Sequence, residues 1–387
     1  MDSRKRMQTI KPFLFSIGAV FVFFTAVEVG LRLSGFEPVI HFKTHSIPAW
    51  MEELDPVVLE KYKRFVAGLG FVNEDVYAYE PDLRYGYRLK PNLFLTVRNY
   101  SSALMIDKLP AWTIRSDAQG FRAPSQEPVA TEPSARTVHV LGDSSSFGWG
   151  VNYEKTYSSV LVGKLNADSS STRYKLRNLS LPGFSSFQGN LLWEDFATVK
   201  NGDWVILSFG WNDSTPSLET DSQKYKSRTS LLGSINWNLR HFSLYRWMRT
   251  WSLPESTIVK KKDIGVRVPT TQYRENIEAL VAKIRQKGAK PLWVSVCNFN
   301  DHQSTAKKIA ENMKTPFFDF PSALKPFIPT VPERFPKRFV TYFEAYGEGM
   351  KTNPMLLFLF PDRCHPNEIG HELMAEVLFE AIEGEAL

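Results

Sequence analysis

The stretch TVHVLGDSSS, residues 137–146, decides how the rest of the chain is interpreted. Its first five residues are mostly apolar or β-branched, which is typical of a short buried strand. Gly142 and Asp143 are turn-forming residues, and three serines follow directly. In open α/β sheets, ligands bind at the carboxyl ends of the strands, which is where these serines would lie. A polar loop is the alternative, and the surrounding sequence distinguishes the two.

Short strands and amphipathic helices alternate after residue 136. Strands are predicted at 137–141, 176–179, 204–209, 292–297 and 317–319, and helices at 157–165, 272–287, 306–313 and 368–382. This alternation indicates a parallel sheet with helices on both faces.

Residues 214–266 interrupt the alternation. Within them, LLGSINWNLRHFSLYRWMRTW at 231–251 mixes aromatic residues with Arg240, Arg246 and Arg249 at roughly helical spacing. Three interpretations fit: a lid over the site, a surface that rests on lipid headgroups, or a basic amphipathic helix packed on the domain.

Composition and charge exclude several classes of protein. The chain has 387 residues with 43% hydrophobic content, which is typical of a globular protein. Its net charge of +6 includes Arg4, Lys5, Arg6 and Lys11 at the amino terminus, and no basic stripe with interleaved aromatics occurs elsewhere. Nucleic acid is therefore not expected as a partner. The only two cysteines lack the paired spacing of zinc sites, so no metal or other cofactor is expected.

Residues 12–33 form an apolar segment long enough to cross a membrane once. No small-x-small cleavage site follows it, so an uncleaved anchor is favoured over a signal peptide. The basic residues before it place the amino terminus in the cytoplasm and the rest of the chain outside. Glu28 near the outer end is expected to reach the interface or to pair with Arg32.

Four regions follow from these patterns. Residues 1–11 are predicted to be a cytoplasmic tail and 12–33 a transmembrane anchor. Residues 34–130, rich in aromatics and prolines, are a small β-leaning juxtamembrane region, and the stretch 125–136 is a linker by its composition. Residues 131–387 are the α/β domain, with the insertion 214–266.

The predicted strand ends carry groups suited to acyl transfer. Ser144 ends the first strand, Gly183 and Asn212 follow the second and third, and Asp362 and His365 precede the last helix. Such chemistry needs a nucleophile, a base, a group that orients the base, and donors for the oxyanion. We assign Ser144, His365 and Asp362 to the first three roles.

The oxyanion donors are predicted to be the backbone N–H groups of Ser144 and Gly183 and the side-chain amide of Asn212. Ser144 is preferred to the next two serines because it occupies the turn itself. Asp143 is expected to hold that turn rather than to titrate in catalysis.

Four ordered blocks, Gly142-Asp143-Ser144, Gly183, Gly210-x-Asn212-Asp213 and Asp362-x-x-His365, resemble those of the SGNH, or GDSL, hydrolase superfamily. The resemblance covers about residues 137–385 apart from the insertion. It implies a flavodoxin-like three-layer α/β/α sandwich whose five-stranded parallel sheet has the order 2-1-3-4-5, and it implies ester cleavage or acyl transfer. The single anchor also resembles envelope-bound members, some of which act on acetylated polysaccharides.

The predicted function is that of a membrane-anchored serine esterase outside the cytoplasm, in the periplasm or at the cell exterior. It would remove acyl groups, with acetyl as one candidate, from an envelope carbohydrate or lipid. An O-acyltransferase of envelope polysaccharide using the same three residues is the first alternative. A carbohydrate-binding scaffold with an inactive site is the second.

Four residues outside this set also give expectations. In the implied strand order Cys297 and Cys364 lie on the same edge of the sheet, and an oxidising compartment would let them form a disulfide beside His365. Two unpaired cysteines are the alternative. His371 is expected to be an exposed helix residue. Arg267 is expected to lie on the surface, with binding of an anionic group near the site as the alternative.

Overall fold

The computed structural model describes residues 3–35, 78–97, 109–125, 135–167, 172–239, 241–252, 265–297 and 301–386. The chain forms two compact units. The smaller unit combines Met1–Ser46 with Ser227–Val259, and the larger combines Ile47–Lys226 with Lys260–Leu387. Most of the predicted linker at 125–136 and much of the juxtamembrane region lie outside the described residues.

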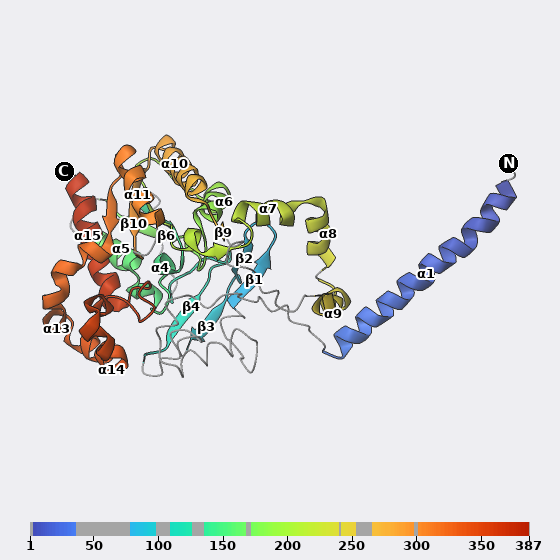
Figure 1. Ribbon diagram of the computed structural model, residues 1–387, viewed down its shortest axis with the longest axis horizontal. Coiled ribbons are helices and arrows are strands. Elements are labelled where there is room, and N and C mark those ends of the chain that lie inside the picture. Colours follow the sequence, from blue (N-terminus) through green and yellow to red (C-terminus); the bar gives the residue numbers. More distant parts are fainter. Residues whose placement is uncertain are drawn as a thin grey trace. The chain divides into compact units, whose positions relative to one another are not determined.

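A five-stranded parallel sheet forms the centre of the larger unit (Figure 1). Its order is β11-β10-β7-β5-β6, which is the predicted 2-1-3-4-5. The strands are β5 (Arg136–Gly142), β6 (Tyr174–Asn178), β7 (Trp204–Ser208), β10 (Lys290–Ser295) and β11 (Phe317–Asp319). All five predicted strands are therefore confirmed. These segments form strands because they are short, buried apolar runs that contain β-branched residues.

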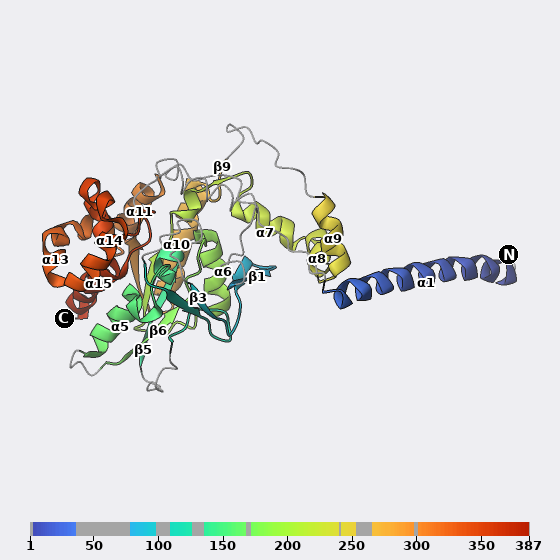
Figure 2. The ribbon, with the colours of Figure 1, turned by 90° about the horizontal axis from the view of Figure 1, so that it is seen from below.

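Alternate residues of these strands enter two separate cores, because neighbouring side chains in a strand point to opposite faces. Val138 and Ile206 belong to one core, together with α5 (Tyr157–Ala167) and α15 (Glu368–Ala386). These two helices lie side by side (Figures 1 and 2). The other core contains Leu141, Val205 and Trp293 and is covered by α6 (Ser186–Phe196), α10 (Thr270–Gln286) and α11 (Asp301–Asn312). The three-layer α/β/α architecture is thus confirmed.

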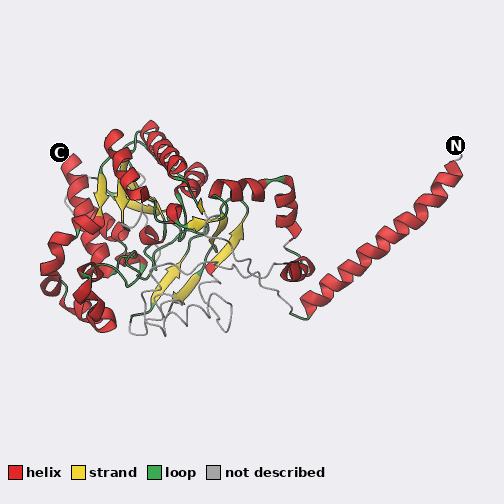
Figure 3. Cartoon of the chain, viewed as in Figure 1, coloured by secondary structure: helices red, strands yellow, loops and turns green. Residues whose placement is uncertain are grey.

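Several helices between β11 and α15 were not predicted (Figure 3). The segment 321–336 contains five prolines and shows no helical period. Proline is accepted in the first turn of a helix, where its missing N–H is not needed, and these helices use it there. They are α12 (Phe320–Ala323), η5 (Lys325–Thr330), α13 (Val331–Arg334), α14 (Pro336–Thr352) and η6 (Pro354–Leu357).

The described part of the juxtamembrane region consists of two antiparallel strand pairs. They are β1 (Tyr79–Asp82) with β2 (Gly86–Leu89) and β3 (Phe94–Val97) with β4 (Trp112–Arg115). Leu89, Trp112 and Phe121 are buried in the same core as Leu141 and Phe147. The β-leaning character is confirmed, and these strands support the core next to the serines.

The smaller unit contains α1 (Ser3–Leu33), α8 (Leu231–Leu239) and α9 (Ser243–Ser252). Among the described residues, Leu14–Leu33 is the one helical span long and apolar enough to cross a membrane. Glu28 and Arg32 form the expected ion pair, with 2.6 Å between Oε1 and Nε. The two-stranded pair β8 (Pro216–Ser217) and β9 (Gly265–Val266) lies in the larger unit at the two ends of the insertion. Helix α7 (Asp221–Thr229) follows β8, and its residues from Ser227 onward belong to the smaller unit.

Candidate active site

Ser144 is the first residue of the short helix α4 (Ser144–Phe147), directly after β5. Asp143 caps this helix by accepting the Ser145 N–H at 2.9 Å, so it holds the turn as predicted. Ser145 and Ser146 are buried, and the Ser146 hydroxyl bonds to the Tyr157 hydroxyl at 2.7 Å. Ser144 is the only one of the three that is partly exposed. The strand-to-helix turn therefore presents one serine hydroxyl to a substrate.

The structure brings Ser144, His365 and Asp362 together in hydrogen-bonding order. His365 Nε2 lies 2.7 Å from Ser144 Oγ, although the two residues are 221 positions apart. On the other side of the ring, Nδ1 lies 2.5 Å from Asp362 Oδ2. Asp362 Oδ1 accepts the backbone N–H groups of Cys364 and His365, each at 3.0 Å, which fixes the carboxylate against the loop. This is the arrangement required of a nucleophile, a base and an orienting carboxylate.

The electrostatic environment of His365 suits a base. Burial by itself lowers the pKa of the imidazole, but the Asp362 carboxylate and its hydrogen bond outweigh burial. The charge of Asp143 acts in the same direction, and the net result raises the pKa of His365 above its usual value. A proton taken from Ser144 is therefore held firmly by the ring.

The predicted oxyanion donors follow β6 and β7. Gly183 has φ +76°, a conformation that favours glycine, and an added Cβ would collide with the Tyr87 hydroxyl. Asn212 begins the 3-10 helix η3 (Asn212–Ser214), and its amide donates to Asp143 Oδ2 at 3.1 Å. An amide group carries two N–H donors, and this bond uses one of them. Asp143 therefore orients Asn212 as well as the turn, which the sequence analysis missed.

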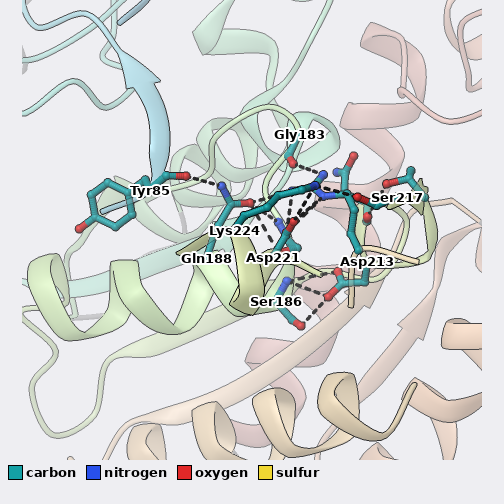
Figure 4. A network of polar contacts seen from close by, with 12 residues as sticks. Tyr85, Gly183, Ser186, Gln188, Asp213, Ser217, Asp221 and Lys224 are labelled. Atoms are coloured by element: carbon teal, nitrogen blue, oxygen red, sulfur yellow. Dashed lines mark hydrogen bonds and ion pairs between the residues drawn. The ribbon is translucent and has the colours of Figure 1, made fainter. Parts of the chain in front are cut away.

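Arg267 does not lie on the surface as predicted: its side chain is only 18% exposed. It donates to the Gly183 carbonyl at 2.7 Å and to Gln188 Oε1 at 2.9 Å, and it pairs with Asp221 at 2.8 Å. Figure 4 shows Gly183, Gln188 and Asp221 close to one another within this network of polar contacts. We call Arg267, Asp221 and Gln188 the Arg267 clamp. It holds the loop that carries a predicted oxyanion donor. Arg267 lies 46 positions from Asp221 and 79 from Gln188, too far for a local sequence pattern to pair them.

A second buried carboxylate supports the same loop. Asp213 accepts the Ser186 N–H at 3.0 Å at the start of α6, and it also accepts the Ser186 hydroxyl (Figure 4). Burial raises the pKa of Asp213 to about 7. Asp213 therefore ties the turn after β7 to the first turn of α6.

Side chains of the juxtamembrane region also hold loops of the site. The Tyr87 hydroxyl donates to the Pro182 carbonyl at 2.7 Å. Arg122 is buried and donates to the Phe147 and Gly148 carbonyls, at 2.5 and 2.6 Å, at the end of α4. Burial lowers the pKa of Arg122 to about 9. Nothing in the local sequence around Tyr87 or Arg122 indicated these roles.

Cys297 and Cys364 form a disulfide with their Cα atoms 4.8 Å apart, so the predicted bond is confirmed. It joins the loop after β10 to the loop that carries Asp362 and His365. The Ser145 hydroxyl lies 3.6 Å and 3.8 Å from the two sulfur atoms. The disulfide therefore restrains the base directly behind the nucleophile turn.

The expectation for His371 was wrong. This residue is fully buried, its Nδ1 accepts the Tyr157 N–H at 3.1 Å, and its ring stacks on that tyrosine. Burial lowers the pKa of His371 to about 3, so the ring is neutral. His371 is buried because α15 packs closely on α5. This packing covers more of the α15 surface than the single apolar face that the sequence pattern predicts.

The sequence profile of the GDSL-like lipase/acylhydrolase family matches residues 138–378. No curated protein matches the chain significantly. A putative GDSL-like lipase from Parabacteroides merdae is 15% identical, with a TM-score of 0.38, over 66% of this chain and 98% of that one. An acetylxylan esterase from Geobacillus stearothermophilus is 17% identical, with a TM-score of 0.38, over 64% of this chain and 94% of that one. An esterase from Pseudoalteromonas is 16% identical, with a TM-score of 0.36, over 65% of this chain and 98% of that one.

The family profile spans more than half of the chain, and it includes β5, α4 and the loop of Asp362 and His365. The chain therefore belongs to the GDSL-like lipase/acylhydrolase family and is a serine hydrolase that acts on ester bonds.

Proposed function

We propose that this protein is a membrane-anchored esterase that removes acyl groups, acetyl among them, from a carbohydrate or lipid of the cell envelope. The observation that carries the proposal is the unbroken series of contacts from Ser144 Oγ through His365 to Asp362. A partly exposed hydroxyl in contact with an imidazole of raised pKa is an activated nucleophile.

In the proposed reaction, Ser144 Oγ attacks the carbonyl carbon of the ester while its proton passes to His365 Nε2. The protonated ring then gives this proton to the leaving alcohol oxygen, and the acyl group stays on Ser144. His365 then takes a proton from water while the water oxygen attacks the acyl carbon. The bond from this carbon to Ser144 Oγ breaks, the ring returns the proton to Oγ, and the acid is released. Asp362 stabilises the imidazolium in both steps.

The negative charge that develops on the carbonyl oxygen requires donors already in place. The Ser144 and Gly183 N–H groups and the Asn212 amide fill this role in our proposal. The bond from Asn212 to Asp143 and the Arg267 clamp on Gly183 support it, because both hold a donor in position before a substrate arrives.

Three features support an anchor at 12–33 with the hydrolase outside the cytoplasm. Leu14–Leu33 is apolar and exposed along its length. Arg4, Lys5, Arg6 and Lys11 precede it, which favours a cytoplasmic tail at 1–11. The disulfide favours an oxidising compartment for the catalytic region 131–387. A carboxyl-terminal reporter that is active only in the cytoplasm would contradict this orientation.

Labelling of the full-length protein with a fluorophosphonate tests the catalytic assignment. Ser144→Ala should abolish labelling, whereas Ser145→Ala should retain it. Persistent labelling of folded Ser144→Ala would refute the proposal. A panel of acyl esters then defines the acyl group, and product analysis with and without an acceptor glycan separates hydrolysis from acyl transfer.

A further inference from the structure

Exposed large apolar side chains collect in the smaller unit. Among the described residues, ten such side chains belong to α1 and only four to the larger unit. Six more belong to α8, α9 and the turn between them: Leu231, Leu232, Ile235, Leu239, Phe242 and Met248. We call these six residues the apolar platform. Leu231 and Leu232 are 79% and 74% exposed, which is costly in water and marks an interaction surface.

The start of α9 is attached to α1 through Glu28. The Glu28 carboxylate accepts the Ser243 N–H at 3.0 Å and the Leu244 N–H at 2.9 Å, which are the first two residues of α9. Arg32 pairs with Glu28 and donates to the His241 carbonyl at 2.9 Å. The first N–H groups of a helix lack partners within the helix, and a negative charge there is favourable. Glu28 therefore acts as a helix cap supplied by a distant segment.

This contact also sets the depth of α9 relative to α1. Glu28 lies five residues before the end of α1 at Leu33, which corresponds to about 8 Å along the helix. An interfacial helix lies roughly 5–10 Å deep, at the boundary of headgroups and acyl chains. If α1 crosses the bilayer, the start of α9 lies at that boundary.

We infer that the apolar platform is a lipid-binding surface that rests on the outer leaflet beside α1, with Glu28 docking α9 in place. The inference rests on the proposed anchoring of α1. A phospholipid bilayer is the occupant because α9 contacts α1 within the same compact unit, and both the platform and α1 expose large apolar side chains. The docking of α9 also explains why the apolar span contains the Glu28 carboxylate, since Glu28 has three partners at the interface.

The test uses the full-length protein in vesicles of phosphatidylcholine and phosphatidylglycerol that contain lipids with an acyl-chain nitroxide. Because both native cysteines are in the disulfide, Met248→Cys introduces a single free thiol for an environment-sensitive fluorophore. Glu348→Cys, at a polar position that is 86% exposed in the larger unit, is the matched control. The nitroxide should quench the probe at position 248 and leave the probe at position 348 unchanged.

Variants of α1 test the docking role of Glu28. Glu28→Ala should lower the ratio of docked to undocked α9 roughly fivefold, the effect of losing one helix cap, and so reduce quenching at position 248. Thr25→Ala is the matched control, since the Thr25 hydroxyl donates to the Phe21 carbonyl within α1. Equal quenching in both variants would refute the docking contact.

Extraction with alkaline carbonate distinguishes the two possible failures. If the chain stays in the membrane while the probe at position 248 is not quenched, the platform is not a lipid surface and the inference is wrong. If carbonate releases the chain, the anchoring of α1 itself is wrong.

Discussion

Replacing Arg267 with methionine should lower the kcat of ester hydrolysis by about 10²-fold with little change in KM. Arg267 touches no predicted catalytic residue side chain, and it acts on the site through the Gly183 carbonyl, 2.7 Å away. Loss of one oxyanion donor costs about 10²–10³ in kcat, and a misplacement of about 1 Å costs about 10². The lower figure applies here because the Tyr87 hydroxyl still holds the neighbouring Pro182 carbonyl.

The same substitution leaves Asp221, whose side chain is only 8% exposed, without its arginine. Lys224 Nζ at 3.7 Å and the Ser185 hydroxyl at 2.7 Å still contact this carboxylate, so the loss of stability should be smaller than the about 3–5 kcal/mol of a buried charge left without any partner. A thermal melt must show that the variant is folded. The double variant Arg267→Met/Asp221→Asn removes both charges and should recover stability but not kcat. This difference separates the loss of loop positioning from the loss of folding.

The assay is steady-state hydrolysis of p-nitrophenyl acetate by the full-length protein in detergent. Lys224→Met is the matched control, because Lys224 also pairs with Asp221, at 3.7 Å, but bonds to Ser217 rather than to Gly183. A folded Arg267→Met variant with wild-type kcat would refute the positioning role. An equal fall in kcat for Lys224→Met would refute it as well, because the effect would then come from charge near Asp221.

Three further predictions concern the site. Asn212→Ala should lower kcat about 10²–10³-fold in the same assay, and an unchanged kcat would exclude this amide as an oxyanion donor. Because Asp362 raises the pKa of His365, the base stays protonated to a higher pH, so kcat/KM should rise with a midpoint above 6.5. Asp362→Asn should move that midpoint to lower pH, and a midpoint that stays in place would contradict the stated cause. Cys297→Ser/Cys364→Ser opens a crosslink that spans 67 residues and should cost roughly 4 kcal/mol, measured as a fall in the denaturation midpoint. Free thiols in protein from native membranes, found by mass spectrometry, would show that the bond does not form there.

The parts of the site that could be predicted were those with local signals. An apolar run followed by Gly142, Asp143 and Ser144 indicates a strand and a turn without knowledge of the rest of the chain. Asp362 and His365 are three residues apart, so one loop brings them together wherever it lies. The parallel topology then places all strand ends at one edge, which is why these residues and the Cys297–Cys364 bond could be anticipated.

The contacts of the remaining polar residues depend on tertiary packing. Arg267 is partly buried because Asp221 and Gly183, 46 and 84 positions away, contact it, and His371 is buried because α15 packs on α5. Glu28 caps a helix more than 200 positions along the chain. A sequence window reports the conformational preferences of neighbouring residues, whereas these contacts depend on which surfaces meet after the chain has packed. Local sequence signals therefore predict the sheet, the nucleophile turn and the base, and tertiary packing selects which side chains hold them in place.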